Sequence, residues 1–193
     1  MPAISDAHGP EFQPYTYDVK PDEEQQLRKK MLALAADEVR ARVKQLASER
    51  VGATEEKRSA KPRTPAKPVQ PSFDDGQLRL FDLSYSNEPT LVLTASARMP
   101  QRPNEDATNL QYLVTVVARV DINGDFHKAF SNVTDTQHLD VTPKFELIDA
   151  VDADGDGRAE LLFRKVSDAG SAFVVYRVIG DQLYALFEGT PGE

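Results

Sequence analysis

The feature that most constrains the fold is a succession of strand-like segments that fills the chain from residue 73 to its C-terminus. Apolar residues alternate strictly with other residues from Leu91 to Met99, which is the period of a half-buried strand. Residues 112–120 and 173–179 are dense in valine and aromatic residues, as is typical of central strands. The patterns predict about eight strands, at residues 77–84, 89–98, 110–121, 126–131, 144–151, 159–166, 172–179 and 182–187.

Turn residues between these segments predict how the strands connect. Asn123-Gly124 and Gly180-Asp181 are typical of two-residue type I′ hairpins, and the polar run 167–171 links the sixth and seventh segments. Strands joined by short hairpins pair antiparallel with their neighbours, so we expect a meander. About eight strands suffice for two blades of a β-propeller, whereas a closed propeller has about four to eight blades. The predicted fold is therefore mainly β, a small sheet, sandwich or split barrel rather than a full propeller, behind one N-terminal helix.

That helix is predicted over residues 21–50. Pro21 and the acidic residues 22–24 suit the first turn of a helix, where carboxylates face the positive end of the dipole. The apolar stripe is narrow and is interrupted by an alanine, which favours a semi-exposed surface helix. Association with a partner through this stripe is the alternative interpretation. The stripe consists of Leu32, Ala36, Val39, Val43 and Leu46.

The segments on either side of the helix lack the patterns of regular structure. Prolines and a glycine interrupt residues 1–20, where Phe12, Tyr15 and Tyr17 are candidates for docking onto a surface. Residues 51–72 are basic, rich in proline and free of aromatic residues, so we expect an extended linker. The β domain is accordingly predicted over residues 73–193.

Composition excludes several classes of protein. Residues 72–193 carry 10 Lys and Arg against 20 Asp and Glu, whereas residues 1–71 carry 13 against 11. An acidic strand-rich region argues against binding of nucleic acid and fits binding of a cation or simple solubility. The chain has no cysteine, and hence neither disulfides nor thiolate ligands, and no apolar run long enough to span a membrane. Residues 1–6 lack the basic and apolar regions of a signal peptide.

One motif carries recognisable chemistry, the loop Asp-Ala-Asp-Gly-Asp-Gly-Arg-Ala-Glu at residues 152–160. Carboxylates stand at its positions 1, 3, 5 and 9, and calcium is a hard cation that takes about six to eight oxygen ligands. The two glycines permit the left-handed backbone that wraps a chain around an ion. The alternative is an ordinary solvated acidic turn. The predicted Ca²⁺ ligands are the side chains of Asp152, Asp154, Asp156 and Glu160 and the carbonyl oxygen of Arg158.

An EF-hand does not fit this loop, because its position 12 is Phe163 and its flanks have strand composition. Residues 147–163 instead resemble the strand–loop–strand calcium hairpin of integrin α-subunit β-propellers and the related FG-GAP and VCBS-type repeats. The motif of these repeats is Asp-x-Asp-x-Asp-Gly-x-x-Asp-Leu, and Glu160 replaces its last aspartate. The resemblance covers only the hairpin. It implies the same five ligands, a structural calcium ion and an extracytoplasmic location.

No set of residues supports an enzyme, and no catalytic residue is predicted. His138 lies between Asp135 and Asp140, and a histidine beside carboxylates can act as a general base. The spacing matches no triad or metal signature, so a polar loop is the favoured interpretation. Nucleophile-elbow, P-loop, dinucleotide-binding and zinc-protease motifs are absent from the sequence.

These observations predict a non-enzymatic, calcium-stabilised β domain of an envelope or secreted protein, with a protein or glycan as its partner. The extracytoplasmic location follows from the millimolar calcium that loops of extracellular modules require. The alternative is a module that binds or acts on a glycan or another polymer, in which the acidic loop shares a cleft with Asp135, His138 and Asp140. A third possibility is an intracellular adaptor that associates through the helix at 21–50.

Overall fold

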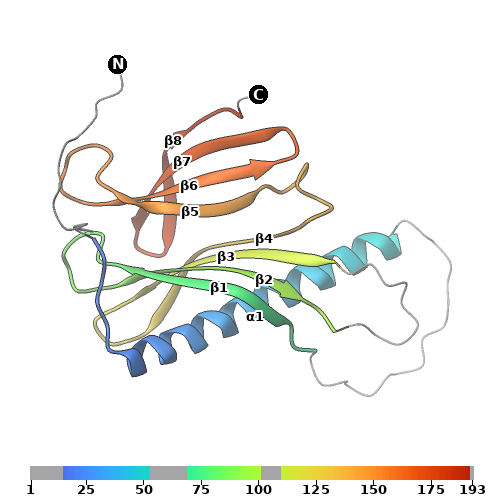
Figure 1. The fold of residues 1–193 in the computed structure, drawn as a ribbon, viewed down its shortest axis with the longest axis horizontal. Coiled ribbons are helices and arrows are strands. Elements are labelled where there is room, and N and C mark those ends of the chain that lie inside the picture. Colours follow the sequence, from blue (N-terminus) through green and yellow to red (C-terminus); the bar gives the residue numbers. More distant parts are fainter. Residues whose placement is uncertain (1–14, 53–68, 101–109, 192–193) are drawn as a thin grey trace.

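The computed structural model describes residues 15–52, 69–100 and 110–191, which form one helix and two four-stranded sheets (Figure 1). Each sheet is an antiparallel meander in which strands that are consecutive in the sequence lie side by side. This arrangement confirms the predicted mainly β architecture. The elements are α1 (Pro21–Gly52), β1 (Ser72–Phe81), β2 (Thr90–Arg98), β3 (Gln111–Val120) and β4 (Phe126–Asp135) in sheet A, and β5 (Lys144–Val151), β6 (Glu160–Ser167), β7 (Gly170–Ile179) and β8 (Gln182–Glu188) in sheet B.

Most predicted strands differ from the observed ones by one or two residues, and the first and fourth differ more. β1 begins at Ser72 because its polar first residues pair with the end of β2, with a bulge between Asp74 and Gln77. It ends at Phe81 because the Asp82 carboxylate accepts the amides of Ser86 and Asn87 and so closes a turn. β4 runs on to Asp135, whose predicted place was a loop, because it pairs with Tyr112 of β3.

The type I′ prediction for the two hairpin turns is wrong. A type I′ turn needs positive φ at both central residues, but only Gly124 and Gly180 have it, at φ 82° and 57°. The β3–β4 connection spans five residues, and the side chain of Asp121 accepts the amides of Asn123 and Asp125. In the β7–β8 turn the positive φ is at the first central residue, as in a type II′ turn.

The first hydrophobic core lies between α1 and the outer face of sheet A. The side chains of Leu27, Met31, Ala35 and Val39 recur every four residues along α1 and are buried against β2 and β3. The predicted stripe packs on this same core, because Val39 is fully buried and Leu32, Val43 and Leu46 are partly buried there. In the described part of the chain, no helix is long and apolar enough to cross a membrane.

The second core lies between the two sheets and is rich in aromatic rings. Phe130, Phe145, Phe163 and Tyr176 form a cluster whose ring centroids are 5.3–6.3 Å apart. Tyr15 joins this core, and its neighbour Thr16 pairs with Phe81 at the edge of sheet A. Docking of Tyr15 and Tyr17 is therefore confirmed, while Phe12 and most of the predicted linker lie outside the described residues.

Candidate metal site

The acidic loop connects β5 to β6 at one end of sheet B, and it folds around its own carboxylates. Asp152 accepts the amides of Gly155 at 2.7 Å and Gly157 at 3.0 Å, one with each carboxylate oxygen. Both glycines are left-handed, with φ of 79° and 83°. The amide of Asp156 donates to Asp154 and that of Arg158 donates to Asp156. The local sequence thus forms a compact turn from alternating aspartates and glycines, as these residue types favour.

Three of the predicted ligands come together in this turn. Asp152, Asp154 and Asp156 are exposed, and each offers a carboxylate oxygen within 4.8 Å of those of the other two. Oxygens at such separations can contact a single ion at the 2.3–2.6 Å of calcium coordination. The donor chemistry and the spacing of the three aspartates therefore fit a hard divalent cation.

The other two predicted ligands are placed differently. Glu160 is the first residue of β6 and has no solvent exposure, so its carboxylate is buried beneath the turn. Its Oε2 accepts the amide of Ala153 at 2.9 Å. Arg158 is exposed, and its side chain lines the cleft next to the loop. The buried Glu160 carboxylate is thus not grouped with those of the three exposed aspartates.

A residue that the sequence analysis did not select, Arg177 of β7, completes the site. Its Nη2 lies 2.6 Å from Glu160 Oε1, 2.9 Å from Asp154 Oδ2 and 3.0 Å from Asp156 Oδ2. Its Nε donates a second bond to Glu160 Oε1 at 2.8 Å. The hydrogen bond to Glu160 raises the pKa of Arg177, and the charges of the three carboxylates raise it further.

The register of the β6–β7 hairpin brings Arg177 to the loop. Ser167 pairs with Gly170 around a two-residue turn, and this register extends to Leu161 opposite Tyr176. If the same register continues by one residue, Glu160 lies opposite Arg177 at the end of the hairpin. The two-residue turn Asp168-Ala169 therefore sets which residues of β6 and β7 lie opposite each other. Had the length of this turn been known from the sequence, it would have identified Arg177 as the partner of Glu160.

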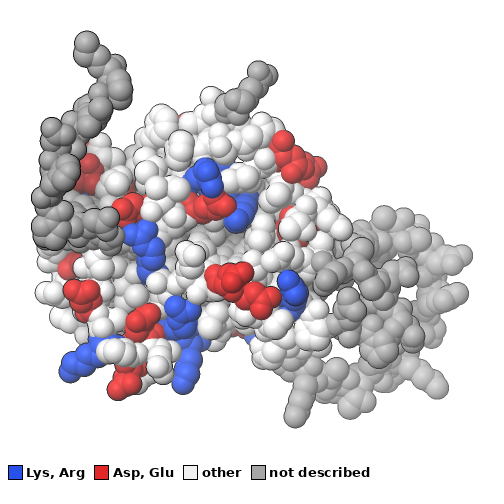
Figure 2. Space-filling view, viewed as in Figure 1, with Lys and Arg blue, Asp and Glu red and all other residues white. Residues whose placement is uncertain are grey.

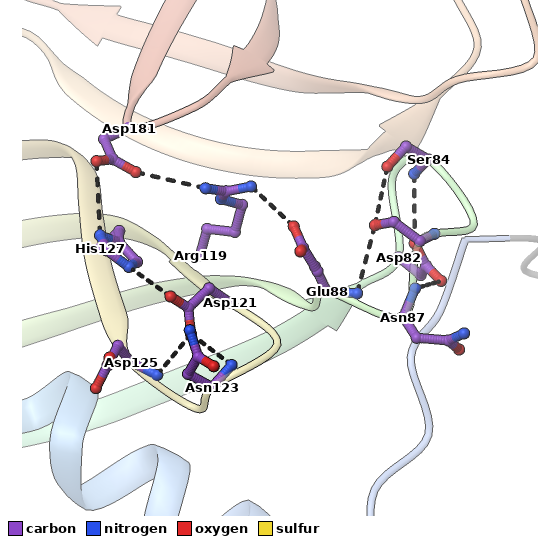
Figure 3. A network of polar contacts seen from close by, with 11 residues as sticks. Asp82, Ser84, Asn87, Glu88, Arg119, Asp121, Asn123, Asp125, His127 and Asp181 are labelled. Carbon is purple, nitrogen blue, oxygen red and sulfur yellow. Dashed lines mark hydrogen bonds and ion pairs between the residues drawn. The ribbon is translucent and has the colours of Figure 1, made fainter.

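A cleft next to the loop lies between the two sheets. Arg119 of β3 reaches across it to Glu88 at 2.8 Å and toward Asp181 of the β7–β8 turn at 3.7 Å (Figure 3). His127 lies 3.5 Å from Asp181 and 3.1 Å from Asp121, so the network joins the β3–β4 and β7–β8 turns. Leu83, Ser84, Arg158 and Arg177 also line the cleft, and none of its described lining residues is aromatic.

The group around His138 lies elsewhere. Asp135 is fully buried at the end of β4, and His138 Nδ1 lies 2.7 and 2.8 Å from its two oxygens. Asp135 pairs with Tyr112 at the start of β3, whereas Arg119 near the end of β3 lines the cleft. The expected sharing of one cleft is therefore wrong, because this group and the acidic loop lie near opposite ends of β3.

Charged groups on the molecular surface are mixed rather than separated. Figure 2 shows Lys and Arg interspersed with Asp and Glu over the viewed face. In sheet B, for example, the Glu146 carboxylate accepts hydrogen bonds from Lys144 and Arg164, which lower its pKa despite partial burial. The loop around Asp152 differs, since there Asp154, Asp156 and Glu160 share one arginine.

A scan against protein-family models found no match to the chain, and searches of curated proteins and of solved structures found none either. Any function proposed for this chain therefore rests on the geometry of the loop and of its neighbours. This geometry defines a two-sheet β protein with an acidic hairpin loop at one end.

Proposed function

We propose that this chain is a calcium-stabilised β domain of an extracytoplasmic protein, with a structural or binding role rather than a catalytic one. The observation that carries the proposal is the convergence of the Asp152, Asp154 and Asp156 carboxylates within 4.8 Å. The resemblance of the hairpin to FG-GAP and VCBS-type repeats supports the wider ligand set with the Arg158 carbonyl and Glu160.

Calcium suits this loop better than the other common cations. Its ligands are all oxygens, and the described residues around the loop contribute neither histidine nor a sulfur ligand, which zinc prefers. Magnesium demands near-ideal octahedral geometry, whereas calcium tolerates the irregular oxygen sets of exposed turns. Exposed loops of this type bind calcium weakly, and the millimolar calcium of extracytoplasmic spaces matches that weak affinity.

A bound ion would stabilise the junction between the two sheets. The loop ends at Ala159, whose buried amide donates to the carbonyl oxygen of Leu83 at 2.7 Å. Leu83 follows β1 of sheet A, so this bond joins the acidic loop directly to the other sheet. An ion that holds the loop in this conformation would therefore oppose separation of the sheets.

The test is thermal unfolding of the full chain with millimolar calcium and with a chelator. A ligand that binds the native state alone raises Tm by mass action, so we expect Tm to rise in calcium and to rise less in magnesium. Asp154→Asn, which removes one ligand charge, should abolish most of the rise.

Asp168→Asn is the matched control, because Asp168 is an exposed aspartate in the β6–β7 turn of the same sheet. It removes the same charge and should keep the full calcium response. An unchanged Tm of the parent protein in calcium would overturn the proposal. An equal loss of response in both variants would assign the effect to net charge instead of the loop.

The glycan-binding alternative has no specific observation in its favour. Recognition of sugars by stacking needs exposed aromatic rings, and the part of the chain that the structure describes contributes none to the lining of the cleft next to the loop. Association through α1 is likewise not favoured, because the predicted stripe already packs on sheet A.

A further inference from the structure

We infer that Arg177 is the resident counter-ion of the acidic loop, and that Arg177 and a divalent cation exclude each other there. The inference rests on the proposed calcium binding and adds its regulation. In this view the loop alternates between two cations, one built into the chain and one taken from solution.

Hydrogen bonds and ion pairs engage every carboxylate oxygen of the loop. Both oxygens of Asp152 accept backbone amides, as does one oxygen each of Asp154, Asp156 and Glu160. The three remaining oxygens all face Arg177 Nη2. The chain therefore satisfies the whole acidic cluster by itself.

The nitrogen Nη2 lies among oxygens of three of the proposed calcium ligands, Asp154, Asp156 and Glu160. Oxygens from three different residues surround it at 2.6–3.0 Å, although an Nη nitrogen carries only two hydrogens. Asp154 and Glu160 accept hydrogen bonds from Nη2, and Asp156 forms an ion pair with it, so one positive charge serves three carboxylates. An ion that used Asp154, Asp156 and Glu160 would need the same three oxygens.

Electrostatics also prevents the guanidinium and the ion from sharing the loop. An arginine stays protonated at all ordinary pH values, and a divalent cation a few ångströms away would repel it strongly. Glu160 makes the competition between Arg177 and the ion stronger, because it is fully buried and its Oε1 already binds both Nε and Nη2 of Arg177. For Glu160 to become a ligand, that double contact must break.

The structure provides a place for the displaced side chain. Arg177 is not enclosed, since 21% of its side chain is exposed, and it already lines the cleft next to the loop. A rotation of the guanidinium toward this cleft would free the three oxygens without moving β7. Calcium would then bind more weakly than it would to the same aspartates without Arg177. Its binding would also move the Arg177 side chain into the cleft between the sheets.

The test measures calcium affinity by titration calorimetry on the full chain, for the parent and for Arg177→Gln. The variant removes the competing charge, so we expect its Kd for calcium to be about tenfold lower than that of the parent, within the usual range of coupling between sites. Its Tm should be lower than the parent's in chelator, and calcium should raise it more. Arg177→Lys keeps a positive charge and should leave Kd close to the parent's.

Arg164→Gln is the matched control, because Arg164 lies in the same sheet and pairs with Glu146 outside the loop. It should leave the Kd for calcium unchanged. If Arg177→Gln binds calcium no more tightly than the parent does, competition is overturned while the proposed function stands. If only the variant binds calcium, competition is upheld and the proposed function of the natural chain fails. If neither binds, both are overturned.

A measurement on the parent protein covers the case in which Arg177→Gln does not fold. The Nε–H of Arg177 is bonded to Glu160, so its NMR signal should shift and its hydrogen exchange should accelerate as calcium saturates the loop. A signal that stays unchanged at saturating calcium would overturn the inference.

Discussion

At the scale of single residues, aspartate side chains close the turns of this molecule by accepting backbone amides. Asp82 does so after β1, Asp121 after β3 and Asp152 after β5. Such bonds satisfy backbone donors that no strand partner reaches, and they are stronger when the acceptor is charged. The turns should therefore depend on the ionisation of these carboxylates.

Asp121 allows a test of that dependence. Hydrogen bonds from the Asp125 amide and the His127 ring lower its pKa below the ordinary 3.8, although partial burial opposes the shift. A lowered pKa contributes stability that is complete above 3.8 and is lost as the pH falls through the folded value. Asp121→Asn should therefore lower the urea midpoint at pH 7, and its difference from the parent should shrink below pH 4.

The same titration with Asp168→Asn serves as the control, because Asp168 is an exposed aspartate of the β6–β7 turn and its loss should change little at either pH. A difference between Asp121→Asn and the parent that is equal at pH 7 and at pH 3 would show that the bond, and not the charge, stabilises the turn.

At the scale of elements, α1 belongs to the core instead of lying apart from the strands. Four of its side chains are buried against sheet A, and polar contacts hold both sides of the helix. Arg28 donates to the carbonyl of Gly76 in β1 at 2.8 Å, and Glu38 accepts hydrogen bonds from Lys128 and Ser131 of β4. A chain that begins at residue 72 would expose the outer face of sheet A.

Substitution of Met31 tests how much the packing of α1 on sheet A contributes to the free energy of unfolding. Its side chain has no exposure and packs in the core between α1 and sheet A. Met31→Ala should lower the free energy of unfolding by about 2–5 kcal/mol, because it removes buried methylene groups and leaves a cavity. Lys44→Ala, on the exposed side of the helix, should change it by less than about 0.5 kcal/mol. Equal effects in chemical unfolding would argue against docking of α1.

At the scale of the whole molecule, side chains from one sheet bind the backbone of the other. Arg79 of β1 donates to the Ile148 carbonyl at 2.8 Å and to Asp149 at 2.7 Å. The buried Thr115 hydroxyl of β3 donates to the carbonyl of Phe145 at 2.8 Å. These contacts surround the aromatic cluster, so the two sheets should unfold as one unit.

Phe163, which packs on Phe145 and Tyr176 in the aromatic cluster, tests that cooperativity. It is fully buried between the sheets, and Phe163→Ala should cost about 3–5 kcal/mol of unfolding free energy. Phe173→Ala is the matched control, because Phe173 of the same sheet is 53% exposed and should lose far less. A single transition by both circular dichroism and fluorescence is expected for each variant. Two separate transitions would mean that the sheets unfold independently.

Local pattern in the sequence determined much of the fold. Alternation and turn residues located all eight strands, and the bounds of β5 agree with the prediction, because a strand's period is a property of a few neighbouring residues. The aspartates of the acidic loop could likewise be found together, since they lie within five positions of one another. The N-terminal signals of α1 were recognisable for the same reason.

Contacts between distant residues were decided by the tertiary structure alone. Arg177 reaches Glu160 across 17 positions only because the β6–β7 turn sets their register. The stripe of α1 did not reveal that its partner is sheet A. The sequence also left open an alternative in which Asp135 and His138 share a cleft with the loop, although they lie at the other end of β3. Composition and period describe which face of an element is apolar, but the partner of that face depends on packing of the whole chain. For that reason the sequence alone predicted the acidic turn, and only the folded molecule placed the guanidinium of Arg177 beside it.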